Sequence, residues 1–184
     1  QVNEGIFVEQ HTYIQSLQAI SLTADREKQK DELLTKEEKS KLRSVSGQLL
    51  WATTQSRPDS AFDACVVGNY GKEPTIRNIL LANKCIKKLQ GIQTQLLFPA
   101  LGDVQNLHVI TYGDASHANL PSGASQGGML VFLAGNGRVA PLMWQSKKLS
   151  RVTKSPFAAE TMAQAEVADA GVLVAKMAEE VFLN

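Results

Sequence analysis

The stretch ITYGDASHANL, residues 110–120, decides how the second half of this chain is interpreted. Apolar and aromatic residues lead up to Asp114, and small polar residues follow it. This pattern predicts a β-strand from Leu107 to Asp114 that ends on a carboxylate. A strand-end aspartate is either an ordinary turn residue or one half of a metal site whose other half comes from elsewhere in the chain.

Two more strands and a long helix are predicted after this strand. Residues 127–134 and 141–146 have strand character, and Asn136-Gly137 between them is a strong hairpin-turn signal. Ser155-Pro156 then supplies a cap followed by a proline in the first turn, which predicts the start of a helix that runs toward the end of the chain. The second half is therefore predicted to have the order strand, strand, strand, helix.

The first half is predicted to be mainly helical. Thr35 opens the stretch TKEE, where it can cap a helix while Glu38 completes a capping box. Pro58 and Pro74 mark the starts of two later helices, and Gly91 marks a stop. On these helices we expect buried faces at Leu42, Val45, Leu49, Leu50 and Thr53, and at Phe62, Cys65 and Val66.

The character of the 184-residue chain changes near residue 92. We expect an α/β fold of the α+β kind, with a helical region at residues 1–98 and a mixed region at residues 99–184. A content of 43% hydrophobic residues is enough for a buried core. The two cysteines, Cys65 and Cys85, lack metal-ligand spacing and are expected to be small buried hydrophobes in a reducing compartment.

Targeting signals are not found in the sequence. No apolar run is long enough to span a membrane, and the start of the chain lacks a signal-peptide pattern. We therefore expect an intracellular location, cytoplasmic or nuclear, and no membrane partner. Because the chain does not begin with Met, we expect it to be a piece of something longer.

The net charge of +1 hides a sorted distribution. Five basic residues and no acid lie between Gly137 and Ser155, whereas five acids and one base follow from Pro156 onward. A basic segment beside an acidic helix suits a site that faces phosphates and holds cations. Two ordinary solvated faces would give the same pattern.

Two carboxylates are candidates for a shared metal site. Hydrolysis of a phosphodiester by two metal ions needs several carboxylates around cations about 3.5–4 Å apart. Asp114 at a strand end and Glu160 about one turn into the last helix can meet, and their oxygens suit magnesium. The alternative makes Asp114 a turn residue and Glu160 a partner of the helix dipole. The remaining nearby acids are predicted to lie on the wrong face or too far away: Asp103, Glu166, Asp169 and Glu179.

Several segments together resemble the C-terminal part of a copia-type LTR-retrotransposon polyprotein, where reverse transcriptase runs into its ribonuclease H domain. LRSVSGQLLWATTQSRPDSAFDACV, residues 42–66, resembles the Leu-x-Gly-x-Leu-Leu-Tyr and Thr-Arg-Pro-Asp signature of the helices after the polymerase palm. YGDAS resembles the strand that carries the first catalytic aspartate, and MWQSKKLSRV resembles a Trp-x-Ser-Lys-Lys strand. SPFAAETMAQAE is similar to the helix that carries the second catalytic acid.

The resemblance implies a function and its partners. The parent protein would hydrolyse RNA in RNA–DNA hybrids with Mg²⁺ or Mn²⁺ in a two-metal site, with Asp114 and Glu160 as catalytic metal ligands. Its partners would be an RNA–DNA hybrid or template–primer duplex and the remainder of the polyprotein. Few aromatic residues argue against a surface for stacking single strands. Six basic residues are expected to contact phosphates: Arg77, Lys84, Lys87, Lys88, Lys147 and Lys148.

The chain also departs from the family pattern. Relatives use further aspartates on later elements, and only two active-site carboxylates are predicted here, so we expect this truncated piece alone to be inactive. Without the later strands, residues 107–114 should form an open sheet edge, covered by missing chain, by a partner such as a second copy in a homo-oligomer, or by a non-native packing of the first half. The alternative function is a domesticated non-catalytic remnant that acts as a nucleic-acid-binding or assembly module.

Overall fold

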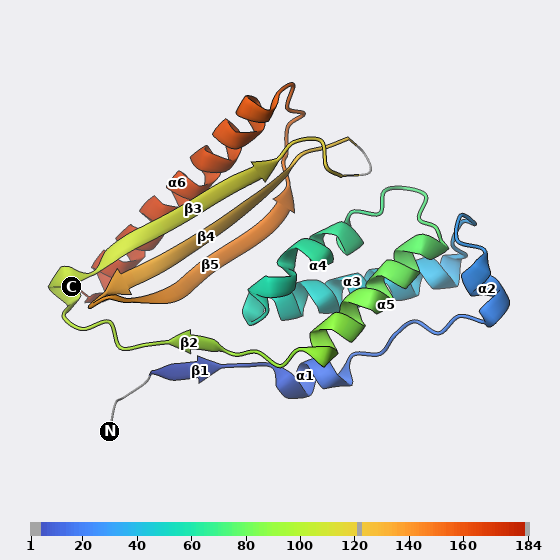
Figure 1. Cartoon of the computed structure of the whole chain (residues 1–184), viewed down its shortest axis with the longest axis horizontal. Coiled ribbons are helices and arrows are strands. Elements are labelled where there is room, and N and C mark those ends of the chain that lie inside the picture. Colours follow the sequence, from blue (N-terminus) through green and yellow to red (C-terminus); the bar gives the residue numbers. More distant parts are fainter. Residues whose placement is uncertain (1–4, 121–122, 183–184) are drawn as a thin grey trace. The chain divides into compact units, whose positions relative to one another are not determined.

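The computed structural model describes residues 5–120 and 123–182 and divides the chain into two compact units (Figure 1). One unit covers residues 9–95, and the other combines the first strand with the residues from Leu96 onward. The first strand thus groups with the second unit, although it lies within the range expected for the helical region. The predicted mixture of helices and sheet is confirmed.

The helical unit has its capped helix where the sequence predicted. Thr35 Oγ1 accepts a hydrogen bond from the Glu38 amide at 3.2 Å, and Glu38 Oε2 accepts one from the Thr35 amide at 2.8 Å, which confirms the capping box. Pro58 opens a short 3-10 turn, and Pro74 precedes the Thr75 cap of the last helix. In chain order the elements are α1 (His11–Ser16), α2 (Ala24–Lys28), α3 (Lys36–Gln55), η1 (Pro58–Ser60), α4 (Ala61–Gly68) and α5 (Ile76–Gly91).

The core of the helical unit lies among α3, α4 and α5. Two residues predicted on its buried faces are instead exposed, Leu50 by 55% and Phe62 by 51%. On α3, Leu50 lies 100° around the helix axis from the fully buried Leu49. On α4, Phe62 lies about 160° around the axis from the buried Ala64. Both side chains therefore point away from the core. The fully buried large apolar side chains are Leu42, Leu49, Val67, Ile76, Ile79, Ile86 and Leu89.

A buried arginine explains the Arg-Pro-Asp motif of this unit. Arg57 is 1% exposed, and its Nε and Nη2 donate to the two carboxylate oxygens of Asp59, each at 2.8 Å. Its Nη1 donates to the carbonyl oxygen of Leu89 at 2.8 Å. The hydrogen bonds from Arg57 lower the pKa of Asp59. The guanidinium therefore ties the turn η1 to the last turn of α5.

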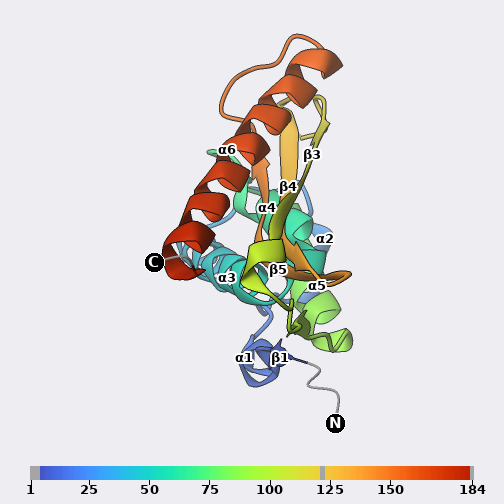
Figure 2. The same ribbon diagram turned by 90° about the vertical axis from the view of Figure 1, so that its left-hand side faces the viewer.

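The second unit contains a three-stranded antiparallel sheet, in which the three strands predicted by the sequence lie in chain order, and a long helix on one face (Figures 1 and 2). The predicted strands are confirmed and each is longer than predicted. Asn136 and Gly137 have φ values of 49° and 69°, as a two-residue hairpin turn requires. The elements are β1 (Ile6–Val8), β2 (Leu96–Phe98), η2 (Val104–Asn106), β3 (His108–Ser116), β4 (Gln126–Gly135), β5 (Arg138–Lys148) and α6 (Pro156–Phe182).

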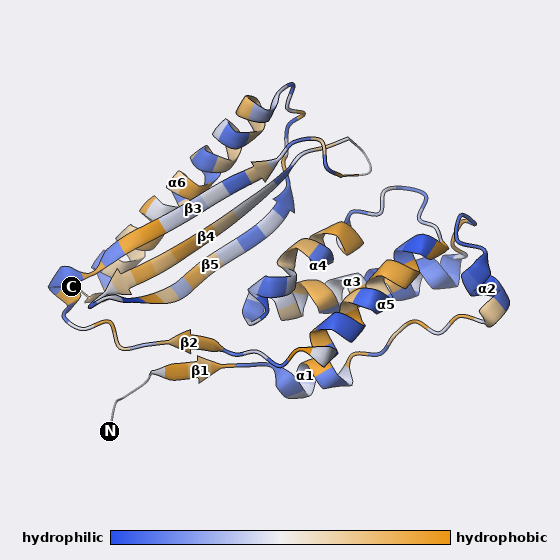
Figure 3. Ribbon diagram, viewed as in Figure 1, coloured by the Kyte–Doolittle hydropathy of each residue, from blue (hydrophilic) through white to orange (hydrophobic). Residues whose placement is uncertain are grey.

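A short strand pair completes this unit. Strands β1 and β2 are antiparallel, and both are hydrophobic (Figure 3). Ile6 is nevertheless 70% exposed. Among the residues that the structure describes, none of the helices has both the length and the apolar character needed to cross a membrane.

Helix α6 packs on the face of the sheet formed by the odd-numbered residues of β3 and β4. A Cβ added to Gly113 would lie 2.7 Å from a methyl group of Val167, so position 113 points at the helix. Because side chains alternate along a strand, the neighbouring Asp114 leaves the sheet on the opposite face. The apolar residues that join sheet and helix are Val109, Met129, Val131, Met143, Val167, Ala170 and Val174.

Candidate metal and nucleic-acid site

The structure brings Glu160 to the strand that carries Asp114. The Ser155 hydroxyl accepts from the Ala158 amide at 3.2 Å and so caps the first turn of α6. One turn further on, Glu160 Oε2 accepts a hydrogen bond from the amide of Ala115 at 3.2 Å. Asp114 itself is exposed near the end of β3. The two candidate carboxylates thus belong to segments that are joined by a hydrogen bond beside Asp114.

A second side chain of α6 holds the same part of β3. Gln164 lies one turn after Glu160, and its Nε2 donates to the carbonyl oxygen of Gly113 at 2.7 Å. Within the described part of the sheet β3 pairs only with β4, so these backbone groups belong to its outer edge. Strand β3 is thus an edge strand, as predicted, and two side chains of α6 bind backbone groups of this edge on either side of Asp114. No pattern in the sequence signals this contact, because it depends on how α6 is rotated against the strand.

The two candidate metal ligands at this site are of the chemical type that binds a hard divalent cation. Both candidates offer carboxylate oxygens, the ligands that magnesium and manganese prefer. The Asp114 side chain leaves the sheet on the face opposite α6, whereas the Glu160 side chain reaches the edge of β3 from the face that α6 covers. Within residues 5–120 and 123–182 there is no group of three or more His, Cys, Asp or Glu side chains that could hold a metal.

Two other acids of this unit have structural partners. Asp103 accepts from the Gln105 amide at 3.0 Å and caps η2. Glu166 forms an ion pair with Lys147 at 3.0 Å. Asp169 and Glu179 are exposed on α6.

Three of the six basic residues expected to contact phosphates already have acidic partners. Arg77 binds Asp31 through two hydrogen bonds of 2.6 and 3.0 Å. Lys88 binds Asp63 at 2.6 Å, and Lys147 binds Glu166. The other three are exposed, and no ion pair involves them in the described part of the chain: Lys84, Lys87 and Lys148.

The loop after β3 is tied to the loop before α6. His117 Nε2 lies 3.2 Å from the carbonyl oxygen of Thr153, and the hydroxyl groups of Ser125 and Thr153 lie 2.6 Å apart. The Ala118 amide also donates to the Ser125 hydroxyl at 3.0 Å. These bonds hold in place the two segments that flank Asp114 and Glu160. The two bonds to Thr153 join residues 36 and 28 positions apart in sequence, so local patterns could not reveal them.

Gln126 is a further polar residue that the sequence did not single out. It pairs with Ser116 of β3 and Lys148 of β5, so it shares the face from which Asp114 projects. Its Nε2 donates to Ser146 Oγ at 2.6 Å. Its Oε1 is buried and has no hydrogen-bond partner among the described residues. An unsatisfied buried acceptor of this kind is unfavourable and is a mark of strain or of a missing polar partner.

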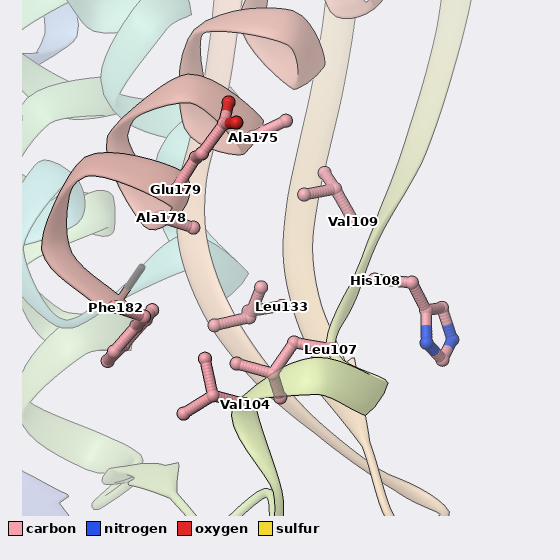
Figure 4. Close-up of a pocket in the computed structure, with 9 residues that line it drawn as sticks. All are labelled: Val104, Leu107, His108, Val109, Leu133, Ala175, Ala178, Glu179 and Phe182. Carbon is pink, nitrogen blue, oxygen red and sulfur yellow. The ribbon is translucent and has the colours of Figure 1, made fainter. Parts of the chain in front are cut away.

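A small apolar cavity lies at the other end of α6. Its volume is about 280 Å³, and apolar side chains from η2, β3, β4 and α6 surround it (Figure 4). His108 points away from the other lining side chains, and Glu179 supplies the carboxylate. The cavity thus lacks the several converging polar groups of a catalytic site.

Comparison with known proteins points to a mobile element. The chain is 32% identical over 116 residues to the putative transposon Ty5-1 protein of Saccharomyces cerevisiae. This similarity supports an origin in a retrotransposon. The aligned part covers 61% of the chain but only 35% of the yeast protein. No family model matches the chain, and no solved structure matches it.

Proposed function

We propose that this chain is part of a copia-type retroelement polyprotein, in which a reverse transcriptase thumb and connection region is followed by the N-terminal part of a ribonuclease H domain. The parent protein hydrolyses RNA in RNA–DNA hybrids. The observation that carries this proposal is the 3.2 Å hydrogen bond from the Ala115 amide to Glu160, since it holds the helix acid at the residue that follows Asp114 in β3. The similarity to a transposon protein supports the same origin.

In this proposal Asp114 and Glu160 hold Mg²⁺ or Mn²⁺. The cation supplies Lewis-acid stabilisation to the phosphodiester group that is hydrolysed. Glu160 accepts the Ala115 amide through Oε2, so it would hold the cation through Oε1 without giving up this hydrogen bond, while Gln164 binds the Gly113 carbonyl oxygen. Gln164 is then a positioning residue that keeps β3 against α6.

The same proposal makes the isolated chain inactive. Two-metal hydrolysis uses more carboxylates than this pair. Asp103 and Glu166 are held in a cap and an ion pair, so neither supplies the missing ligand without giving up its partner. The remaining ligands would come from the rest of the polyprotein.

A hybrid-cleavage assay tests this proposal. The chain is incubated with an end-labelled RNA–DNA hybrid and Mg²⁺ or Mn²⁺, and hybrid binding is measured in parallel. We expect binding that weakens as salt rises, and no RNA cleavage. Turnover that is lost in Asp114→Asn but kept in the matched α6 variant Asp169→Asn would contradict the predicted inactivity. A chain that neither binds hybrids nor binds a divalent cation at Asp114 would contradict the proposed function.

The alternative, a domesticated remnant that binds nucleic acid without catalysis, is favoured by one observation. Glu160 is engaged by a backbone amide, which is a structural role. If this role is its only one, Glu160→Gln should weaken the packing of β3 on α6 without changing the affinity for Mn²⁺. Under the leading proposal Glu160→Gln lowers that affinity.

A further inference from the structure

The loop before α6 and the first turns of this helix form an exposed surface that is both apolar and basic. Val152 is 89% exposed and Phe157 is 81% exposed, which makes them the most exposed large hydrophobic side chains among the described residues. They line one open groove of about 580 Å³ together with Arg151 and Lys154. We call these four residues the 151–157 surface.

The charges of the 151–157 surface are not neutralised in the described part of the chain. Arg151 and Lys154 are exposed and take part in no ion pair there. No acid lies anywhere between Gly137 and Ser155, and Glu166 further along α6 is already bound to Lys147. An apolar protein partner would have to bury these charges without counter-ions, which is unfavourable. A polyanion with apolar faces would satisfy both the charges and the exposed apolar side chains.

The loop that carries this surface is anchored on both sides. Leu149 is 2% exposed, and its amide donates to the carbonyl oxygen of Ser125 at 2.9 Å. Thr153 is held by His117 and by the Ser125 hydroxyl. Val152 lies between these anchors and points into solvent. Because the backbone is held in place, a ligand that binds here does not have to order it, which lowers the entropic cost of binding.

We propose that the 151–157 surface binds an unpaired segment of nucleic acid. Phe157 and Val152 contact the face of a base, and Arg151 and Lys154 contact the phosphates on either side of it. A single exposed aromatic ring is enough for one stacked base, so the small number of aromatic residues in the sequence does not exclude this role. Every base has an apolar face, so the contact is independent of sequence.

The proposal deepens the proposed function and rests on it. Phe157 lies one turn before Glu160 on α6, and residues at this spacing are neighbours on a helix surface. A strand held at Phe157 therefore passes close to the end of β3 that carries Asp114. The surface would hold the single-stranded segment that adjoins a hybrid.

Fluorescence anisotropy with labelled oligonucleotides of about 12 nucleotides tests this inference. The full chain is titrated with single-stranded RNA, single-stranded DNA and a blunt RNA–DNA hybrid. Phe157→Ala should weaken binding of both single strands by about five-fold or more and leave the blunt hybrid unchanged. Phe182→Ala removes a 48% exposed ring at the far end of the same helix and should change neither the single-strand affinity nor the hybrid affinity.

Charge variants give a second, independent readout. Arg151→Gln combined with Lys154→Gln should lower the slope of log affinity against log salt for single strands by about 0.7 for each phosphate that is no longer neutralised. Lys176→Gln, an exposed charge further along α6, should leave the slope unchanged. Phe157 is too exposed for its removal to unfold the chain, and circular dichroism of each variant checks this.

The outcomes separate the inference from the proposed function. If the wild-type chain binds single strands and hybrids but Phe157→Ala changes neither affinity, or lowers both equally, the inference is wrong and the proposed function stands. If the chain binds anionic phospholipid vesicles through Phe157 and no single strand, the surface belongs to a membrane and the inference is wrong. A chain that binds neither nucleic acid nor a divalent cation at Asp114 overturns both.

Discussion

Replacing Arg57 by Ala should destabilise the helical unit strongly. The guanidinium is 1% exposed and makes three hydrogen bonds of 2.8 Å, two to Asp59 and one to the carbonyl oxygen of Leu89. Its removal leaves the Leu89 carbonyl without this donor, which costs about 1–3 kcal/mol. Removing one partner of a buried ion pair costs about 3–5 kcal/mol, but the Asp59 side chain is 36% exposed and can regain water. We therefore expect the free energy of unfolding to fall by about 3 kcal/mol.

Arg77→Ala is the matched control for this variant. Arg77 also binds an aspartate through two guanidinium nitrogens, at 2.6 and 3.0 Å, but its side chain is 61% exposed and that of Asp31 is 80% exposed. Exposed pairs contribute little to stability, so this variant should unfold close to wild type. Urea unfolding followed by circular dichroism gives both free energies. Equal destabilisation of the two variants would contradict the structural role of the buried Arg57.

Two further predictions concern β3 and the capping box of α3. Gly113→Ala should cost about 1–3 kcal/mol, because the added Cβ would lie 2.7 Å from an α6 side chain, whereas Gly128→Ala on the neighbouring strand meets nothing within 4 Å and should be tolerated. Thermal unfolding compares the two, and equal melting temperatures would argue against tight packing of β3 on α6. The pKa of Glu38 is lowered from 4.5 to about 2, chiefly by the hydrogen bond from Arg26. This lowered pKa stabilises the folded state above about pH 4.5, and the contribution disappears as the pH falls toward 2. In Glu38→Gln the urea midpoint should therefore vary less between those pH values than in wild type, and an unchanged pH dependence would contradict this cause.

The elements that depend on local sequence could be predicted. The capping box at Thr35, the turn at Asn136-Gly137 and the start of α6 after Ser155 all follow from residues within a few positions of each other. The alternating and helical patterns of the second half predicted three strands and a helix for the same reason. These patterns also selected Asp114 and Glu160 as the acids at the ends of two neighbouring elements.

Features that depend on how elements pack could not be predicted. The exposure of Leu50 and Phe62 depends on which side of each helix packs against neighbouring helices. A helical period in the sequence predicts an apolar face that is wider than the face actually buried. Gln164 covers the edge of β3 only because α6 lies along that strand. The buried role of Arg57 requires the end of α5 to lie beside it, 32 residues away in sequence.

Paramagnetic broadening in solution can show whether Asp114 and Glu160 share a divalent cation. Mn²⁺ is titrated into the ¹⁵N-labelled chain, and the amide signals of β3 and α6 are followed by NMR. We expect the signals of Asp114, Ala115 and Glu160 to broaden at lower Mn²⁺ than that of the exposed Asp169, and Asp114→Asn to remove this preference. Equal broadening at all acidic residues, or selective broadening that survives Asp114→Asn, would contradict this expectation.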